Sequence, residues 1–420
     1  MAPHSSVFKK ISKRVNMKTV VLIGTLDTKS VEYEFARNRF QKAGLKTILI
    51  NAGIIGQSLI QNDVTNEKVA QAGGSDLQSL RDRNDRGFAV SIMTKGVNKV
   101  VQDLYQKGEL DGVFALGGSG GSTIASFAMR NLPIGVPKVL VSTLVSSNAA
   151  SFVGESDLAL FASVVDIAGV NSISAKVIAN AVDATIGMVN GEKVEIKNSK
   201  NLIAASMFGV TTQCVTRARE ILEENNFEVI TFHMTGTGGK SMENLIRQGF
   251  INAVLDVTTT EICDEIVGGT LSAGPDRLTA AVDMKIAQVV SVGALDMVNF
   301  GNKNTVPEKF KNRNLYVHNE NVTLMRTTPE ECEKIALDIA TKLNKVTAPV
   351  TLFLPLKGVS AIATKGGIFF DEKADDALFS TLRKNVGNNV ELIELDLAIN
   401  DNDFSTAIAN KLIQLVKVGK

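Results

Sequence analysis

Two stretches, one in each half of the chain, follow the same residue pattern, and this repeat limits the possible folds more than any other feature. Residues 106–118 read QKGELDGVFALGG, and residues 247–259 read RQGFINAVLDVTT. In each stretch a glycine ends a helical segment and a short apolar run of strand type follows. The two halves also open alike, with strand, helix and strand in the same order, at 18–24, 30–43 and 45–51 and again at 202–208, 216–224 and 228–233.

Strands that alternate with helices in this way are typical of a doubly wound parallel sheet. We therefore predict an α/β fold with two Rossmann-like doubly wound parallel-sheet domains related by internal duplication. The length of 420 residues suits two or three domains, and we place them at residues 17–190 and 200–420.

Three segments lie outside this pattern. Residues 1–16 carry Lys9, Lys10, Lys13 and Arg14 but no acidic residue, and we interpret them as an added extension, a disordered leader or a weak transit peptide. Residues 52–88 are polar and are predicted to be an irregular excursion that serves as a lid or an interface. Residues 144–156 are small and are predicted to form a loop.

Ligands of open α/β sheets bind beyond the carboxyl ends of the strands. The turns predicted at such ends are residues 25–29, 117–122, 143–147, 235–240, 256–261 and 293–296. If the two domains face each other, these turns line one shared cleft. Thr143 is included among the predicted ligand-binding residues on this ground.

The glycine-rich turn after the strand at 112–116 is the clearest candidate for anion binding. A strand, a glycine turn and a helix leave N–H groups unpaired at the positive end of the helix dipole, which suits a phosphate or a carboxylate. A tight turn without a ligand is the alternative, and the turn matches neither GxGxxG nor GxxxxGK[ST]. The predicted binding residues are Gly117, Gly118, Ser119, Gly120, Gly121 and Ser122.

A second candidate turn, Thr25 to Lys29, combines an acid, hydroxyl groups and a cation after the first strand. Lys29 would neutralise a phosphate, and Asp27 would hold Mg²⁺ through water. Asp27 or Thr28 would alternatively only cap the following helix. Capping does not account for Lys29.

In the second half, the turn after the strand at 228–233 resembles a Walker A loop but has Met234 in place of its first glycine. It is either a phosphate-gripping loop or a flexible hinge. The predicted binding residues are Thr235, Gly236, Thr237, Gly238 and Gly239.

His233, at a predicted strand end, is a candidate general acid or base, although a structural, hydrogen-bonded histidine fits equally well. Glu261 is a second catalytic candidate, and Asp256 is a candidate Mg²⁺ ligand with Asp27. Carboxylates at 256, 261 and 264 suggest a divalent cation, or merely acids that complement a helix dipole. Thr328, Pro329 and Glu331 have the spacing of a helix start with a capping box.

Composition narrows the function classes. Lys plus Arg number 45 and Asp plus Glu 44, so the net charge of +1 gives no general argument for nucleic acid or an acidic membrane. Trp is absent and Tyr occurs three times, which disfavours aromatic base-stacking surfaces. No apolar run is long enough to span a bilayer. The three cysteines have no zinc spacing, and we expect a reducing, cytoplasmic compartment.

Several stretches from Met17 onward resemble one family: GTLDTK, LGGSGGS, LPIGVPKVLVST, SVVDIAGVN, TGTGGKSMENLI, GGTLSAGPDRL and VGALDMVNFG. They are similar to the N-terminal region of the plant tobamovirus-resistance proteins, which inhibit viral RNA replication, and to their mostly uncharacterised bacterial and fungal relatives. The resemblance implies an ATP-binding region with Mg²⁺, built from two Rossmann-like domains that dimerise. In the plant proteins it precedes a TIM-barrel domain that has no counterpart in this sequence.

Two function classes follow from the residues and the resemblance. The first is an ATP- and Mg²⁺-dependent enzyme acting on a small metabolite, with ATP and that metabolite in the interdomain cleft. The second is an ATP-responsive binding protein for a macromolecular partner, as in the plant inhibitor. A homodimer or larger assembly is expected in both cases, and nucleic acid and membrane partners are not.

Overall fold

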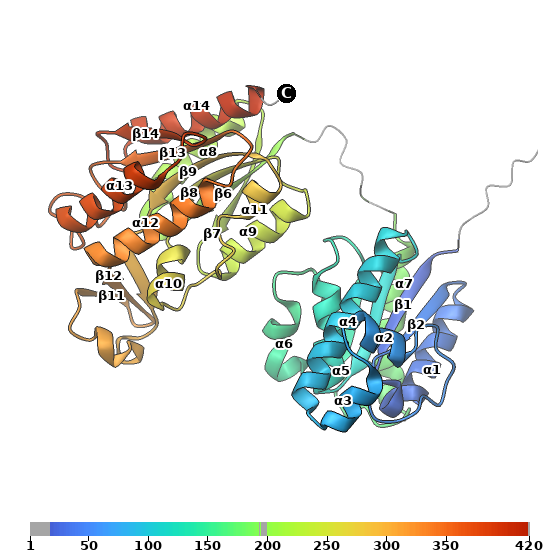
Figure 1. The fold of residues 1–420 in the computed structure, drawn as a ribbon. Helices are drawn as coiled ribbons and strands as arrows, with labels where there is room; N and C mark the ends of the chain where they lie inside the picture. Colours follow the sequence, from blue (N-terminus) through green and yellow to red (C-terminus); the bar gives the residue numbers. More distant parts are fainter. Residues whose placement is uncertain (1–16, 193, 195–199, 419–420) are drawn as a thin grey trace, which may run out of the picture. The chain divides into compact units, whose positions relative to one another are not determined.

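The computed structural model describes residues 17–192, 194 and 200–418, so the interpretation of residues 1–16 lies outside the described residues. The chain divides after Val194 into two compact units, and Figure 1 shows each as a sheet with helices on both faces. The structure thus has the α/β architecture with two parallel-sheet domains that the sequence predicts.

The first unit is built on a five-stranded parallel sheet in the order β2-β1-β3-β4-β5. The strands are β1 (Thr19–Gly24), β2 (Lys46–Asn51), β3 (Gly112–Gly117), β4 (Lys138–Ser142) and β5 (Ala159–Ala162). The helices are α1 (Leu26–Lys42), α2 (Asn66–Ala72), α3 (Leu77–Arg83), α4 (Arg86–Gln106), α5 (Ser119–Arg130), α6 (Val145–Val153) and α7 (Ser174–Asn190).

Alternate strand residues supply the two cores of this unit, as the period of two in a strand requires. Val20 and Leu22 pack with α1 and α7 on one face of the sheet. Val21 and Ile23 pack with α4 and α5 on the other face. Since both faces are covered, the strands read as continuous apolar runs, which is typical of parallel sheets.

The second unit repeats this order and extends it, with a parallel sheet in the order β14-β13-β9-β8-β6-β7. Its strands are β6 (Leu202–Met207), β7 (Glu228–His233), β8 (Ala253–Thr258), β9 (Ala287–Gly293), β13 (Val350–Pro355) and β14 (Glu391–Leu395). Read from β7, the first five strands follow the topology of the first unit, and β14 is added at the edge. The helices are α8 (Thr212–Glu224), α9 (Thr237–Arg247), α10 (Glu261–Val267), α11 (Ala280–Asp283), α12 (Pro329–Leu343), α13 (Glu372–Asn385) and α14 (Asn402–Val418).

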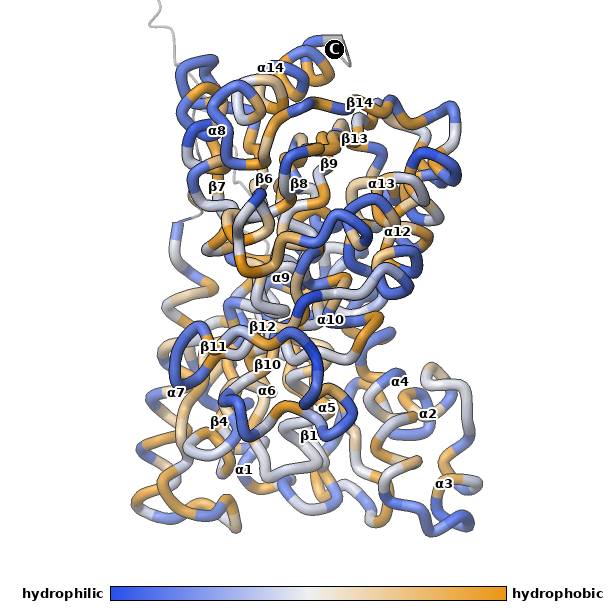
Figure 2. The backbone as a smooth tube through the Cα atoms, turned by 90° about the vertical axis from the view of Figure 1, so that its left-hand side faces the viewer, coloured by the Kyte–Doolittle hydropathy of each residue, from blue (hydrophilic) through white to orange (hydrophobic). Residues whose placement is uncertain are grey.

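One helix start is formed as the sequence predicts. Thr328 accepts a hydrogen bond from the Glu331 N–H, and the Glu331 side chain accepts one from the Thr328 N–H, with Pro329 as the first residue of α12. Figure 2 shows hydrophilic and hydrophobic residues alternating along the helices, as expected where one side of a helix is buried.

Several local predictions are wrong. Residues 52–88 contain α2 and α3, and residues 144–156 contain α6. Helix α1 begins at Leu26 instead of residue 30, with a kink at Lys29. A small antiparallel sheet in the order β10-β12-β11, with strands Met297–Phe300, Val322–Arg326 and Leu315–Asn319, was not predicted from the sequence. These elements are short, so their hydrophobic period is hard to recognise.

Candidate functional site

The topology of the first sheet creates a crevice at its carboxyl edge. After β1 the chain turns to α1 on one face, and after β3 it turns to α5 on the opposite face. Because the two connections diverge, an opening forms between β1 and β3, which is the ligand-binding position in doubly wound sheets.

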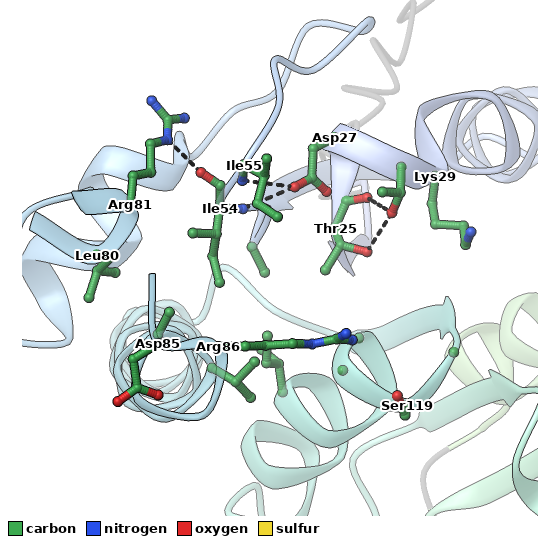
Figure 3. A pocket seen from close by; sticks show the side chains of 18 of the residues that line it. Thr25, Asp27, Lys29, Ile54, Ile55, Leu80, Arg81, Asp85, Arg86 and Ser119 are labelled. Atoms are coloured by element: carbon green, nitrogen blue, oxygen red, sulfur yellow. Dashed lines mark hydrogen bonds between the residues drawn. The ribbon is translucent and has the colours of Figure 1, made fainter. Parts of the chain in front are cut away.

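A pocket of about 620 Å³ lies at this position. Around it lie the turn after β1, the segment after β2, the segment from α3 into α4, and the turn after β3, as Figure 3 shows. Residues 52–88, predicted as an irregular lid or interface, therefore provide part of a wall. The lining includes the predicted residues Thr25, Asp27, Thr28, Lys29, Gly118, Ser119, Gly120 and Gly121.

The turn after β3 presents free N–H groups to the pocket. Gly118 is the N-cap of the twelve-residue helix α5 and provides no side-chain cap. Within the described residues, no acceptor is bonded to the N–H groups of Ser119, Gly120 or Gly121. A Cβ added to Gly120 would lie 3.9 Å from the Arg86 guanidinium.

Two cations in the pocket have no charged partner in the described parts of the chain. Lys29 lies at the kink of α1, and Arg86 is the first residue of α4. Figure 3 shows the Arg86 side chain extending from α4 toward the start of α5. Arg81 lines the same pocket and donates through Nε to the Ile54 carbonyl at 2.6 Å.

Asp27 fastens one wall of the pocket. Its Oδ2 accepts hydrogen bonds from the Ile54 and Ile55 N–H groups, both at 3.1 Å. A Cβ added to Gly53 would lie 2.7 Å from the Asp27 carboxyl carbon, so the chain packs directly on this group. Asp27 Oδ1 has no hydrogen-bond partner among the described residues, and the role of Asp27 as an Mg²⁺ ligand stays a prediction. Thr25 and Thr28 hydroxyls lie 3.3 Å apart beside it.

Three predicted residues lie next to this pocket instead of lining it. Gly117 is the buried last residue of β3, and the buried Ser122 hydroxyl donates to Ser142 Oγ at 2.8 Å. Thr143 lines a separate hollow of about 340 Å³ at the carboxyl ends of β4 and β5. Asp166 lines both hollows.

In the second unit, the turn that resembles a phosphate loop holds a carboxylate of the protein itself. The N–H groups of Gly236 and Gly239 donate to Glu261 Oε1 at 2.7 and 3.1 Å. Gly238 and Gly239 leave no room for side chains, because an added Cβ would lie 1.8 Å from the His233 carbonyl oxygen and 1.9 Å from Glu261 Oε2, respectively. Thr235 and Thr237 flank Gly236, and Thr237 begins α9.

Glu261 and Asp256 belong to one buried ionic cluster around Arg277. Arg277 Nε donates to Glu261 at 2.8 Å, and its two other nitrogens donate to both Asp256 oxygens at 2.6 and 2.7 Å. Burial raises the pKa of Glu261, and Arg277 and the loop N–H groups oppose this shift. The geometry favours structural roles for both acids. Both oxygens of Asp256 accept hydrogen bonds from the Arg277 guanidinium, and Glu261 is fully buried.

His233 ends the edge strand β7, with an exposed ring that stacks on Phe208 at a centroid distance of 5.4 Å. Its catalytic role stays a prediction. Among the described residues, no group of three or more His, Cys, Asp or Glu side chains could hold a metal ion.

Sequence reasoning missed Arg81, Arg86 and Asp166. The two arginines lie in the segment that was predicted to be irregular. Asp85 is the sequence signal that could have located Arg86, because aspartate is a favoured N-cap residue. In the structure Asp85 accepts a hydrogen bond from the Phe88 N–H at 2.9 Å, and α4 begins at the next residue, Arg86. Asp166 lies in the stretch SVVDIAGVN, which entered the sequence analysis only through its resemblance.

Family comparisons match both units. Residues 18–194 match the model described as "Uncharacterised protein family (UPF0261) N-terminal domain", and residues 200–416 match the C-terminal domain of the same family. The chain belongs to the UPF0261 family. A UPF0261 protein of Clostridium tetani is 50% identical over 401 residues, which is 95% of this chain and 99% of that protein.

Plant relatives extend well beyond the UPF0261 region. The ToMV resistance protein Tm-1(GCR237) of Solanum lycopersicum is 44% identical over 337 residues, covering 79% of this chain and 45% of the tomato protein. Among solved structures, UDP-N-acetylglucosamine 2-epimerase from Rickettsia bellii aligns over 96% of both chains at 12% identity, with a TM-score of 0.22. In the described part of the chain, no helix is both long and apolar enough to cross a membrane.

Proposed function

We propose that the pocket between β1 and β3 binds the phosphates of ATP and that the protein is an ATP- and Mg²⁺-dependent enzyme acting on a small metabolite. The observation that carries this proposal is the start of α5, whose first N–H groups face the pocket and have no acceptor among the described residues. Lys29 and Arg86 line the same pocket without an ion-pair partner in that part of the chain. The resemblance described above selects ATP among phosphate-bearing ligands.

Charge and geometry support a phosphate at this position. The N–H groups of Ser119, Gly120 and Gly121 have no acceptor among the described residues, and the dipole of α5 adds partial positive charge beside them. Lys29 and Arg86 supply full charges from two other walls. The cavity volume of about 620 Å³ lies within the usual range for small-molecule sites.

Of the two predicted Mg²⁺ ligands, Asp27 fits this role and Asp256 does not. This ion commonly takes one or two carboxylates and completes its shell with water and substrate phosphates. Asp27 Oδ1 is open and would hold it from the turn after β1. Asp256 does not fit, because Arg277 takes both of its oxygens. When bound, the ion would neutralise phosphate charge.

The relationship to the tomato resistance protein favours a second candidate, a binding protein whose affinity for a macromolecular partner depends on ATP. The predicted homodimer fits both candidates. Turnover separates them: an enzyme consumes ATP when metabolite pools are added, and a purely ATP-responsive binding protein does not.

Titration calorimetry with ATP and Mg²⁺ tests the nucleotide site. We expect Gly120→Val to abolish binding, because the branched side chain would screen the N–H groups of the turn and approach Arg86. Gly187→Val is the matched control, since Gly187 lies in a helix of the same unit with open space around it. Unchanged ATP affinity of Gly120→Val, with a normal circular dichroism spectrum, would remove the glycine turn from the site.

A further inference from the structure

The hollow at the carboxyl ends of β4 and β5 lies beside the proposed nucleotide pocket. It has a volume of about 340 Å³ and is lined by Ser142, Thr143, Leu144, Ser146, Ala162, Ser163, Val164, Val165 and Asp166. The two hollows adjoin at two points: Asp166 lines both, and Thr143 Oγ1 lies 3.9 Å from where a Gly118 side chain would begin. A molecule in the smaller hollow would therefore lie next to the glycine turn.

Hydrogen-bonding groups in this hollow are open. The hydroxyls of Thr143 and Ser146 have no partner in the described parts of the chain. Ser142 and Ser163 are engaged within the protein, since Ser142 Oγ accepts from Ser122 and Leu144, and Ser163 donates to the Val165 carbonyl at 2.6 Å. The open hydroxyls can each donate to or accept from a polar ligand.

Asp166 has one free carboxylate oxygen. Its Oδ1 accepts from the Ile167 N–H at 2.8 Å, while Oδ2 has no partner among the described residues, and the side chain is exposed. Both other acids of the nucleotide pocket are partly engaged, Asp27 by the Ile54 and Ile55 N–H groups and Asp85 by the Phe88 N–H.

The backbone that leads to Asp166 is strained. Val164 has a φ of 67°, which is rare for a β-branched residue. The Val165 N–H donates to the Ser163 carbonyl at 2.7 Å across it, the pattern of a γ-turn with an unfavourable central residue. Strain of this kind persists where the surrounding structure maintains it, and it gathers at functional sites.

The charge of the hollow selects its ligand. Among the residues that the structure describes, no Lys, Arg or His lines it, and the Asp166 carboxylate is its one ionisable group. An anionic molecule would therefore face a like charge without compensation. A neutral molecule with several hydroxyl groups could donate to Asp166 and exchange hydrogen bonds with Thr143 and Ser146.

We propose that this hollow binds a neutral, hydroxyl-bearing metabolite, that the metabolite accepts the terminal phosphoryl group of ATP, and that Asp166 takes the proton of the attacking hydroxyl. The proposal rests on the nucleotide-binding function proposed above. In the step, the acceptor oxygen bonds to the terminal phosphorus, and the bond from this phosphorus to the bridging oxygen breaks. The electron pair leaves with ADP, and the hydroxyl proton passes to Asp166.

Three readouts test this assignment on the full chain. Calorimetry measures ATP binding, ligand-observed NMR measures binding of glycerol, erythritol and myo-inositol against glycerate and malate, and a coupled assay measures ADP formation. Ser146→Phe fills the hollow from the exposed start of α6, and Ser147→Phe, on the same helix but outside the hollow, is the matched control. Asp166→Asn removes the charge and keeps the acceptor for the Ile167 N–H.

We expect at least one neutral polyol to bind the wild type and the Ser147→Phe variant but not Ser146→Phe, while all three bind ATP. Asp166→Asn should weaken polyol binding, because its free position becomes an NH₂ donor, and should lower polyol-dependent ADP formation at saturating polyol by about 100-fold or more, the usual contribution of a general base. Preference for glycerate or malate, equal polyol binding by Ser146→Phe, or full activity of Asp166→Asn would overturn the proposal. If ATP itself does not bind, the nucleotide site and the transfer step fail, whereas polyol binding that Ser146→Phe abolishes would still support the hollow as a subsite.

Discussion

At the scale of single residues, the buried Arg277 guanidinium forms ion pairs with three carboxylates of the second unit. It is 1% exposed and contacts Glu243, Asp256 and Glu261. Glu243 also accepts from the N–H groups of Leu278 and Ala280 at 2.6 and 2.7 Å. This one guanidinium therefore compensates carboxylates from β8, α9 and α10, so its removal would leave buried charges unpaired.

We expect Arg277→Met to destabilise the second unit by about 3–5 kcal/mol, the usual cost of breaking a buried ion pair. Urea unfolding followed by circular dichroism measures this loss. Arg219→Met is the control, because the Arg219–Glu223 pair is exposed and should contribute at most about 1 kcal/mol. Similar stabilities for the two variants would show that the Arg277 cluster is not needed for folding.

A second prediction concerns the pH dependence of stability. Burial raises the pKa of Asp264 from 3.8 to about 7, although hydrogen bonds from Asn299 and Leu271 oppose the shift. Because the folded state binds this proton more tightly than the unfolded state, the contribution is full below the unfolded pKa and is lost as pH rises through about 7. Asp264→Asn removes this titrating group.

We therefore expect the stability of the wild type relative to Asp264→Asn to fall between pH 5 and pH 8. Urea unfolding of both proteins at several pH values measures the difference, in which titrating groups that do not interact with Asp264 cancel. A difference that stays constant over this range would contradict a raised pKa of Asp264.

At the scale of elements, the sequence predicted the long and periodic parts best. The alternation of strands and helices along the chain and the start of α12 followed from apolar runs and capping residues. Helices α2, α3 and α6 were missed, since they have only seven to nine residues and sit in polar or small-residue stretches. Short elements of this kind depend on tertiary packing more than on their own propensity.

Likewise, only part of the candidate site could be predicted from the sequence. A glycine turn before a helix could be recognised in both units, because its residue types are local. What fills each turn could not, because this depends on distant residues: Arg86 faces the turn of the first unit, and Glu261 occupies that of the second. Two similar sequence signals therefore lead to an open pocket in one unit and an internally satisfied loop in the other.

Because Glu261 occupies the loop at Gly239, we expect a glycine-to-alanine substitution to lower the stability there and to raise it at Gly187 in α7. In an open helical position, alanine is about 0.5–1 kcal/mol more stable than glycine, and we expect this gain for Gly187→Ala. At Gly239 the same substitution would place Cβ 1.9 Å from Glu261 Oε2, and overpacking costs about 1–3 kcal/mol. Thermal unfolding should show Gly187→Ala above and Gly239→Ala below the wild type, and a gain at both sites would mean that Glu261 does not occupy the loop.

At the scale of the whole molecule, the described residues of each unit form hydrophobic clusters of their own, two in the first unit and four in the second. Each unit is also large enough to fold as a separate domain. Every residue that lines the proposed nucleotide pocket belongs to the first unit. The shared cleft predicted from the sequence stays a prediction. A shared cleft needs the second unit for ATP binding, whereas a site contained in the first unit does not.

We expect the fragment of residues 17–194 to fold and to bind ATP with Mg²⁺ within roughly threefold of the affinity of the full chain, a difference well under 1.4 kcal/mol. Lys29→Met in this fragment should weaken binding about ten- to a hundredfold, because a charge-assisted phosphate contact contributes about 1.5–3 kcal/mol. Lys42→Met, an exposed lysine at the far end of α1, is the control. In the full chain, Thr237→Val should leave ATP affinity unchanged if the site is contained in the first unit. A folded fragment that binds ATP far more weakly than the full chain, together with weaker binding by Thr237→Val, would instead favour a cleft shared by both units.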